Sequence, residues 1–325
     1  MANDFYTPGE AARVLASLVN EDALLSGLVS RNFENDLMAG GKGGAPVALS
    51  IPTTLVARSR AIDDVTNSIL MDEIAETYHT INLNRAHDYS AVPLSEKDLT
   101  LELQDFSKQV LAPQAAAVVD LLEHRVATAL QGVEETTSVA YDPNDPVRTF
   151  TAIRKILRDN GVSASGLNVA VGTEVYAQLL DSKVLTDASQ SGSTAALREA
   201  NVGQVRGFTI VENTRLDEDE IIAFHRDAVT LVTRAPVVPQ GASFGATVNE
   251  KGFSLRYMRD YLAEKTVDRS FVSTFSGVAI LPTYKIERTY NDGAPVNGQS
   301  KGGSATVTEI ENGGIVRVKT STVAP

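Results

Sequence analysis

Residues 58–77 of this 325-residue chain form a long polar stretch with too few apolar side chains to build a hydrophobic core of their own. Alternating apolar residues before it, at 47–51, and after it, at 78–89, predict a long strand on each side. An excursion of this kind gains burial only by packing against another surface. We therefore expect residues 58–77 to lie against another part of the chain or against a neighbouring molecule.

The strongest helical pattern covers residues 107–131. Apolar side chains recur there at steps of three and four residues, beginning at Leu111 and ending at Ala129. Pro113 suits the first turn, and Gly132 suits the C-terminal cap. About 20 residues at 1.5 Å each would span roughly 30 Å, so we expect one long helix.

Shorter elements follow this helix. Asp145-Pro146 predicts the start of a second helix, which should end at Gly161. Past residue 165, short strands and helices mix, and long strands return between residues 253 and 281. This mixture predicts an α+β fold.

Two further segments carry local signals. The stretch 212–220 is rich in acidic residues and predicts a solvated turn. The last part of the chain is rich in Gly, Ser and Thr. Its residues 305–310 and 315–318 are joined through Asn312-Gly313, which predicts a β-hairpin.

Composition excludes several classes of protein. The sequence has no Cys, so disulfides and thiolate chemistry are excluded. The formal net charge of −12 predicts repulsion of nucleic acid in bulk, because phosphate affinity comes mainly from Lys and Arg. No run of about 18 apolar residues occurs, so no membrane partner is expected. The start MANDFYTPGE lacks the basic and apolar regions of a secretory signal.

Motifs that would indicate catalysis are missing. Lys42 follows Gly40-Gly41, as in a phosphate-binding loop, but Gly43 stands where that motif requires Ser or Thr. We interpret the glycines at 39–44 as a flexible hinge instead. No G-x-S-x-G nucleophile motif occurs.

The titratable residues do not form a predicted site either. None of the four histidines has metal-ligand spacing, and His124, four residues after Asp120, predicts a surface pair. Adjacent acids on a strand point to opposite faces, so they rarely form a catalytic dyad. These residues are His79, His87, His124 and His225, with the acid pairs Asp63-Asp64, Asp72-Glu73 and Glu134-Glu135. We predict no catalytic residue, no cofactor-binding residue, no metal ligand and no cofactor, and that the chain is not an enzyme.

The order of these elements resembles that of the tailed-bacteriophage major capsid (coat) protein family. The segments that carry the resemblance, which covers about residues 1–285, are Phe106 to Gln114 entering the long helix, Leu49-Ser50-Ile51-Pro52, and the start from Ala2 to Pro8. The resemblance implies the phage major capsid fold, with an N-arm, an extended loop, a long spine helix, a peripheral domain and an axial domain.

The resemblance also implies domain boundaries. They are residues 1–40 for the N-arm, 41–100 for the extended loop that overlaps a neighbour, 101–165 and 245–290 for the peripheral domain with its spine at 107–131, 166–244 for the axial domain, and 291–325 for a C-terminal extension. The extension would clasp a neighbour or form a surface knob.

The implied function is self-assembly as pentamers and hexamers into an icosahedral shell that encloses phage double-stranded DNA. The first helix begins near Pro8, so we expect a separate scaffolding protein instead of a built-in segment. The other implied partners are the portal protein, a possible decoration protein and packaged DNA in weak non-specific contact. The implied location is the virion, after assembly in the bacterial cytoplasm. Lys42 and Lys97 flank the extended loop, but no Asn is singled out as a partner for an intersubunit crosslink.

Three alternatives stay open. A bacterial nanocompartment shell protein has the same implied fold and encloses cargo enzymes instead of DNA. A phage tail or adhesion structural protein is suggested by the Gly-, Ser- and Thr-rich end. A soluble enzyme is the third, and the motif search disfavours it.

Overall fold

The computed structural model describes residues 9–15, 24–31, 47–51, 53, 55–59, 71, 74, 77–81, 84–95, 107–143, 145–182, 203–242, 244–250, 253–289, 301–302 and 304–320. The predicted glycine hinge at 39–44 lies outside these ranges, as do Lys42 and Lys97. Most of the polar stretch 58–77 also lies outside them.

The predicted long helix is confirmed. It consists of one π-helical turn, Ser107–Leu111, followed by α4, Ala112–Gln131. Pro113 lies in the first turn of α4, where its missing N–H has no intrahelical partner in any case. The apolar stripe, including Val118, Leu122 and Val126, is buried in the first hydrophobic core.

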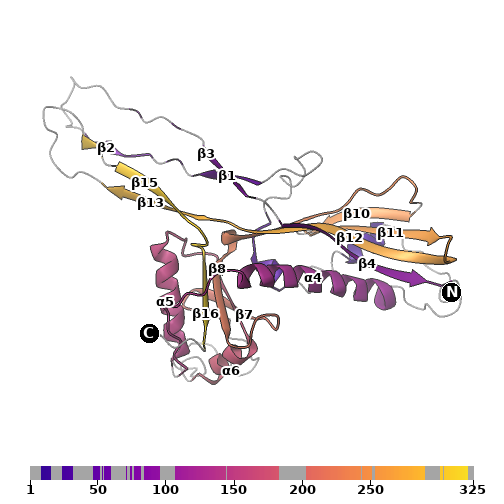
Figure 1. The fold of residues 1–325 in the computed structure, drawn as a ribbon, viewed down its shortest axis with the longest axis horizontal. Coiled ribbons are helices and arrows are strands. Elements are labelled where there is room, and N and C mark those ends of the chain that lie inside the picture. The colour runs from indigo at the N-terminus through magenta and orange to yellow at the C-terminus, as the bar shows by residue number, and fades with distance from the viewer. Residues whose placement is uncertain are drawn as a thin grey trace.

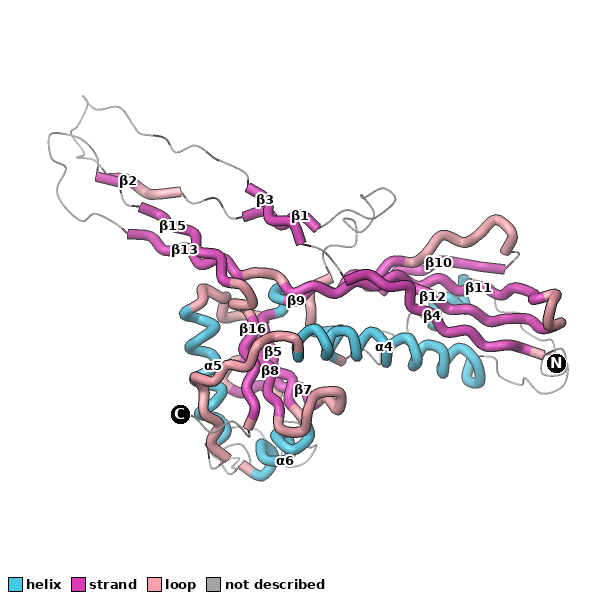
Figure 2. The backbone as a smooth tube through the Cα atoms, in the orientation of Figure 1, coloured by secondary structure: helices cyan, strands magenta, loops and turns pink. Residues whose placement is uncertain are grey.

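α4 lies along a five-stranded antiparallel sheet (Figures 1 and 2). The strand order is β10 (Phe244–Glu250), β11 (Phe253–Leu262), β12 (Val267–Ile280) and β4 (Asn84–Leu94), and β9 (Val229–Arg234) also pairs with β12. β4 contributes its whole length to this sheet, from Asn84 opposite Val278 to Leu94 opposite Asp268.

A compact lobe lies beside one end of α4 (Figure 1). Its sheet has the order β16-β8-β5-β7-β6, where β5 and β7 are parallel and the other neighbours are antiparallel. The strands are β5 (Leu167–Val171), β6 (Gln204–Val205), β7 (Phe208–Glu212), β8 (Glu220–His225) and β16 (Ile315–Lys319). All residues of β5 are buried because this apolar strand lies in the middle of the sheet.

Two helices complete the lobe: α5, Pro146–Asp159, and α6, Thr173–Asp181. The α5 prediction is confirmed. The Asp145 carboxylate accepts a hydrogen bond from the Arg148 backbone N–H at 3.3 Å, and Gly161 follows the helix with a φ of +84°. Phe150 of α5 and Phe208 of β7 lie in the second hydrophobic core, with ring centroids 6.3 Å apart.

Three two-stranded ribbons form an arm that projects away from the sheet and the lobe (Figure 1). The pairs are β1 (Val47–Ile51) with β3 (Thr77–Ile81), β2 (Arg58–Ser59) with β14 (Lys301–Gly302), and β13 (Thr283–Thr289) with β15 (Ser304–Ile310). The strand predicted at 47–51 is confirmed. The single strand predicted at 78–89 is instead two strands, β3 in the arm and β4 in the five-stranded sheet. The arm thus combines residues far apart in the sequence.

Part of the N-terminal region packs onto the core of its own subunit. Residues 9–15 are helical, and the short helix α2 spans Leu25–Leu28. Leu15, Leu25 and Val29 are buried in the first hydrophobic core. No helix among the described residues is long and apolar enough to cross a membrane.

The predicted hairpin of residues 305–310 and 315–318 is wrong. β15 pairs with β13 in the arm, whereas β16 pairs with β8 in the lobe. The turn at Asn312-Gly313 therefore connects two different sheets. Asn312 has a φ of +55°, but Gly313 has no positive φ, so the turn lacks the two left-handed residues of a type I′ hairpin.

Candidate assembly surfaces

The long sheet turns one face toward α4. The Ser270 hydroxyl donates to Gln114 of that helix at 2.7 Å, and Asp88 accepts from Arg125 at 2.6 Å. Because side chains alternate along a strand, the neighbours of Ser270 and Asp88 point to the opposite face. That face carries four aromatic rings, which we call the aromatic face: His87, Tyr89, Phe271 and Phe275.

The rings of the aromatic face contact one another and are accessible. The centroids of His87 and Phe275 lie 5.1 Å apart, and those of Tyr89 and Phe271 lie 5.6 Å apart in a stacked arrangement. Tyr89 is 61% exposed and Phe275 is 41% exposed. Contiguous exposed apolar groups of this kind are typical of protein–protein contact sites.

Two arginines border the aromatic face. The guanidinium carbons of Arg256 and Arg269 lie 5.6 Å and 5.2 Å from the centroid of the Phe271 ring, in cation–π geometry. Burial lowers the pKa of Arg256, whereas a hydrogen bond to Asp260 raises the pKa of Arg269. Both directions leave each side chain positively charged at neutral pH. Arg256 is buried and Arg269 is paired with Asp260, so the aromatic rings make up most of the accessible area of this face.

The arm exposes apolar side chains as well. Met71 is 89% exposed and Ile74 is 71% exposed, and Leu55 and Tyr78 are also exposed. A two-stranded ribbon is marginally stable by itself in water, because it has no second layer to bury its apolar side chains. That residues 58–77 pack against another surface stays a prediction. The exposed apolar side chains of the arm are the candidate contacts.

A buried ion pair fixes the strand that continues from the arm into the sheet. Asp88 of β4 is buried and accepts hydrogen bonds from Arg125 of α4 and from the Ser276 hydroxyl of β12. A buried carboxylate is tolerated only when it is paired and hydrogen-bonded. This pair therefore holds β4 onto α4 and β12.

A second buried carboxylate joins the lobe to the end of α4. Glu220 of β8 is fully buried and accepts hydrogen bonds from Arg317 of β16 and from Gln131 of α4, the latter at 2.9 Å. Arg317 also donates to the backbone oxygen of Val133 at 3.1 Å. The interpretation of residues 212–220 as a solvated turn is therefore wrong at Glu220, and Asn213 and Leu216 of the same stretch are buried as well.

A third buried carboxylate holds the N-terminal region. Glu123 of α4 accepts hydrogen bonds from the backbone N–H groups of Leu25 and Ser26, both at 2.8 Å, and from the Ser26 hydroxyl. Ser30 then bridges to Thr230 of β9, and Leu231 donates to the Ser30 oxygen at 2.9 Å. These bonds attach residues 24–31 to the body of the subunit.

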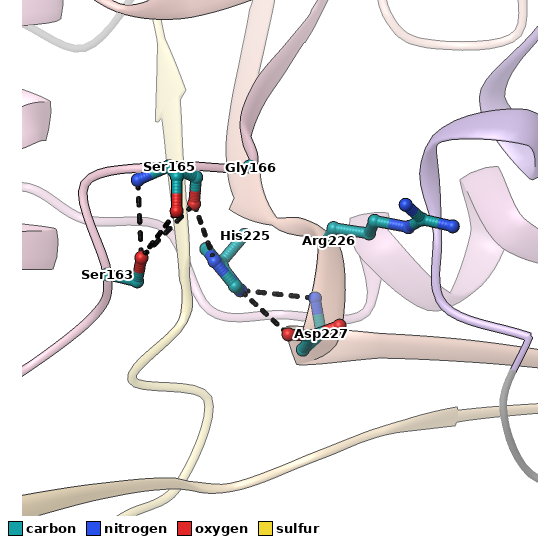
Figure 3. A pocket seen from close by; sticks show the side chains of 6 residues that line it. All are labelled: Ser163, Ser165, Gly166, His225, Arg226 and Asp227. Atoms are coloured by element: carbon teal, nitrogen blue, oxygen red, sulfur yellow. Dashed lines mark hydrogen bonds and ion pairs between the residues drawn. The ribbon is translucent and has the colours of Figure 1, made fainter.

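A polar cavity of about 350 Å³ lies where β8 ends (Figure 3), lined by Ser163, Ser165, Gly166, His225, Arg226 and Asp227. The residue types include a serine, a histidine and an aspartate, but their geometry does not activate a nucleophile. Nε2 of His225 lies 2.8 Å from the backbone oxygen of Ser165, and Nδ1 accepts from the Asp227 backbone N–H at 3.1 Å. Both ring nitrogens are thus engaged by backbone groups, so neither serine hydroxyl has this histidine as its base.

The other titratable residues are dispersed. His124 is exposed on α4, and its predicted partner Asp120 pairs with Arg215. His79 lies on β3, and Glu134 and Glu135 follow α4. Asp63-Asp64 and Asp72-Glu73 lie outside the described residues. Within the described ranges, no three His, Asp or Glu side chains are grouped to hold a metal ion.

The three buried carboxylates were not singled out from the sequence. For Glu123 a signal existed, because it follows Val119 by four residues and precedes Ala127 by four, on the buried stripe of α4. Asp88 and Glu220 had no such local signal, because their partners lie 37 and 97 residues away.

The helix-covered sheet, the α/β lobe and the projecting arm define the fold of a phage capsid subunit, which confirms the predicted fold class. A chain of mycobacterium phage Che8 superposes with a TM-score of 0.57 at 17% identity, over 93% of each chain. A chain from the capsid structure of cyanophage P-SCSP1u superposes with a TM-score of 0.53 at 12% identity, over 85% of this chain and 84% of that one. No protein-family model and no curated protein matches the sequence.

Proposed function

We propose that this chain is the major capsid protein of a tailed bacteriophage, and that it assembles as pentamers and hexamers into an icosahedral shell around double-stranded DNA. The observation that carries the proposal is the combination of this fold with an arm and an aromatic face that both expose apolar side chains. In an isolated subunit these apolar side chains are exposed to water, which costs free energy. Assembly removes this cost if the arm of one copy lies on the aromatic face of the next.

In this proposal α4 is the spine of a peripheral domain. The N-arm is residues 1–40, the extended loop 41–100, the peripheral domain 101–165 and 245–290, the axial domain 166–244, and the C-terminal extension 291–325. β16 lies within the extension and contributes its buried Val316 and Val318 to the core of the lobe.

The energy available at one arm contact is modest and is repeated around the shell. Burying roughly 100 Å² of ring surface at about 25 cal/mol/Å² contributes about 2.5 kcal/mol per ring. Each subunit in a closed shell makes the same contact, so these contributions add through multivalency.

Variants of the aromatic face test this contact. Tyr89→Ser combined with Phe275→Ser should leave a folded subunit, because both side chains are partly exposed, but should prevent stable shell formation. Val237→Ser is the matched control, since Val237 is 82% exposed and lies outside the aromatic face. Sedimentation and electron microscopy measure the outcome. Shells of normal stability from the double variant would exclude the aromatic face as a contact.

Electron microscopy of the purified protein tests the function itself. Closed icosahedral particles with DNA support the proposal. Particles that enclose a cargo enzyme would identify a nanocompartment shell instead, and rings or tubes would identify a tail protein. If the protein stays a stable monomer when it is co-expressed with its neighbouring genes, neither a capsid nor a nanocompartment shell is its function.

The proposed role carries further partners and a location. We propose that a separate scaffolding protein, a portal protein and possible decoration proteins act with this subunit, and that DNA contacts it weakly and without specificity. The net charge of −12 supports weak contact with DNA. The subunit would be assembled in the host cytoplasm and reside in the virion, with a structural and non-catalytic role. Mass spectrometry of purified particles, with and without packaged DNA, tests the partner set.

A further inference from the structure

The ribbon of β13 and β15, which we call the strut, is the part of the arm that joins it to the body of the subunit (Figure 2). Its strands pair from Thr283 opposite Ile310 at the root to Thr289 opposite Ser304 at the outer end. Seven paired residues at about 3.4 Å each give the strut a length of roughly 20 Å. It leaves the body from between β12 and β16, which belong to different sheets.

The root of the strut is tightly packed. A Cβ at Gly314 would lie 2.5 Å from the Ala228 Cβ and 3.1 Å from the Thr283 hydroxyl, so no larger residue fits there. The Asn160 side chain donates to the Gly313 oxygen at 3.0 Å, which ties the root to the end of α5. This packing fixes the direction in which the strut leaves the body.

The outer part of the strut is bonded to the rest of the arm. Beyond its outer end, β14 pairs with β2, with Lys301 opposite Ser59 and Gly302 opposite Arg58. The Arg288 side chain of the strut also donates to the Leu55 oxygen at 3.5 Å. Residues 55–59 of the arm are thus connected to the rigid root within a single subunit.

We infer that the strut is an intramolecular brace that holds residues 55–59 of the arm in their projecting position before any second copy binds. An arm that is ordered in advance loses less conformational entropy when it meets a partner surface. The consequence for assembly rests on the proposed function, but the brace itself is a property of the unassembled subunit.

A cysteine pair tests the brace without removing any element. Ser59→Cys with Lys301→Cys places two thiols at directly opposed positions, where Cα separations in antiparallel strands suit a disulfide. The natural chain has no Cys, so no other thiol competes. Mild oxidation of the unassembled subunit should convert both thiols into an intramolecular disulfide, with loss of the free-thiol signal.

Ser59→Cys with Thr306→Cys is the matched control, because Thr306 lies opposite Glu287 and not opposite Ser59. Its thiols should stay free. If the Ser59→Cys, Lys301→Cys variant also keeps its free thiols, residues 58–59 do not pair in solution with β14 at the outer end of the strut, and the inference is wrong.

Removal of the strut gives a second measurement. Residues 284–309 are replaced by Asn-Gly between Thr283 and Ile310, which already face each other. Spin labels at Met71→Cys and Val237→Cys, both highly exposed, then report the distance between the arm and the body. The distance distribution should broaden when the strut is removed, and an unchanged distribution overturns the brace.

The two proposals fail separately. If the deletion variant does not fold, the cysteine pair still decides whether β2 is paired with β14 at the outer end of the strut. If the disulfide forms in the monomer but no shell is ever obtained, the brace stands and the capsid function falls. If shells form but the cysteine pair forms no disulfide in the monomer, the capsid function stands and the brace is wrong.

Discussion

Glu220 should be the side chain on which the connection between lobe and spine depends most. Glu220→Ala removes the acceptor of Arg317 and of Gln131, and also the 3.3 Å partner of the Asp217 backbone N–H. The Arg317 guanidinium keeps one bond, to the Val133 oxygen, but loses its counter-charge in a mostly buried position. The variant thus leaves a buried cation without its partner.

The expected loss is large. Removing one partner of a buried ion pair costs about 3–5 kcal/mol, and the remaining bond of Arg317 favours the lower end of that range. With a urea dependence of about 3 kcal/mol per molar, a loss of ~3 kcal/mol moves the unfolding midpoint by about 1 M. Equilibrium urea unfolding of the unassembled subunit, followed by far-ultraviolet circular dichroism, measures this shift.

Lys319→Ala is the matched control. Lys319 lies on β16 two residues after Arg317, on the same side of the strand, and pairs with Asp217 at 2.7 Å on the exposed surface. An exposed pair contributes about 0–1 kcal/mol, so its loss should barely move the midpoint. If Glu220→Ala shifts the midpoint no more than Lys319→Ala, then the buried pair does not carry the junction and the reasoning fails.

Three further outcomes are expected. Glu123→Ala leaves the first two backbone N–H groups of α2 without a hydrogen-bond partner in a buried site, which should cost about 1–3 kcal/mol each. Hydrogen exchange at these two amides should become faster, and unchanged exchange would refute the prediction. Burial, helped by nearby acids, raises the pKa of Tyr141 from 10.0 to about 12, so above pH 10 the unfolded chain releases this proton first and stability falls as the pH rises toward 12. Tyr141→Phe should make that alkaline loss shallower in unfolding curves taken from pH 9 to 12, whereas an identical pH dependence contradicts the assignment. Gly314→Ala forces a Cβ against Ala228 and should cost about 1–3 kcal/mol, whereas Gly241→Ala meets no atom within 4 Å and should leave the thermal midpoint unchanged.

The helices were predictable because their signals are local. In α4 the apolar stripe, the early proline and the terminal glycine all lie within one stretch of sequence, and each acts over a few residues. The same holds for α5, whose cap at Asp145 bonds a residue three positions away. The strand at 47–51 was also predictable, but its partner was not, because pairing depends on residues farther along the chain.

The end of the chain shows where local reasoning fails. Asn312-Gly313 between two apolar strands is a strong hairpin signal, yet β15 and β16 separate into the arm and the lobe. The glycines there serve packing, since a Cβ at Gly313 would lie 2.8 Å from the Ile310 side chain. A turn that needs glycine for space has the same composition as one that needs it for a positive φ. The sequence does not distinguish these two reasons.

The acidic residues extend this argument from fold to function. In sequence, Glu220 belongs to a run of acids, and such runs are usually solvated. What buries it is Arg317, which arrives from β16 after the chain has left the lobe, crossed the long sheet and turned back through the strut. The arm and the lobe are therefore coupled through one segment of chain: its return path builds the strut, and its end completes the lobe sheet beside Glu220. A change at this buried pair should consequently weaken the root from which the strut projects, so Glu220→Ala is expected to broaden the Met71-to-Val237 spin-label distance as well as to lower stability.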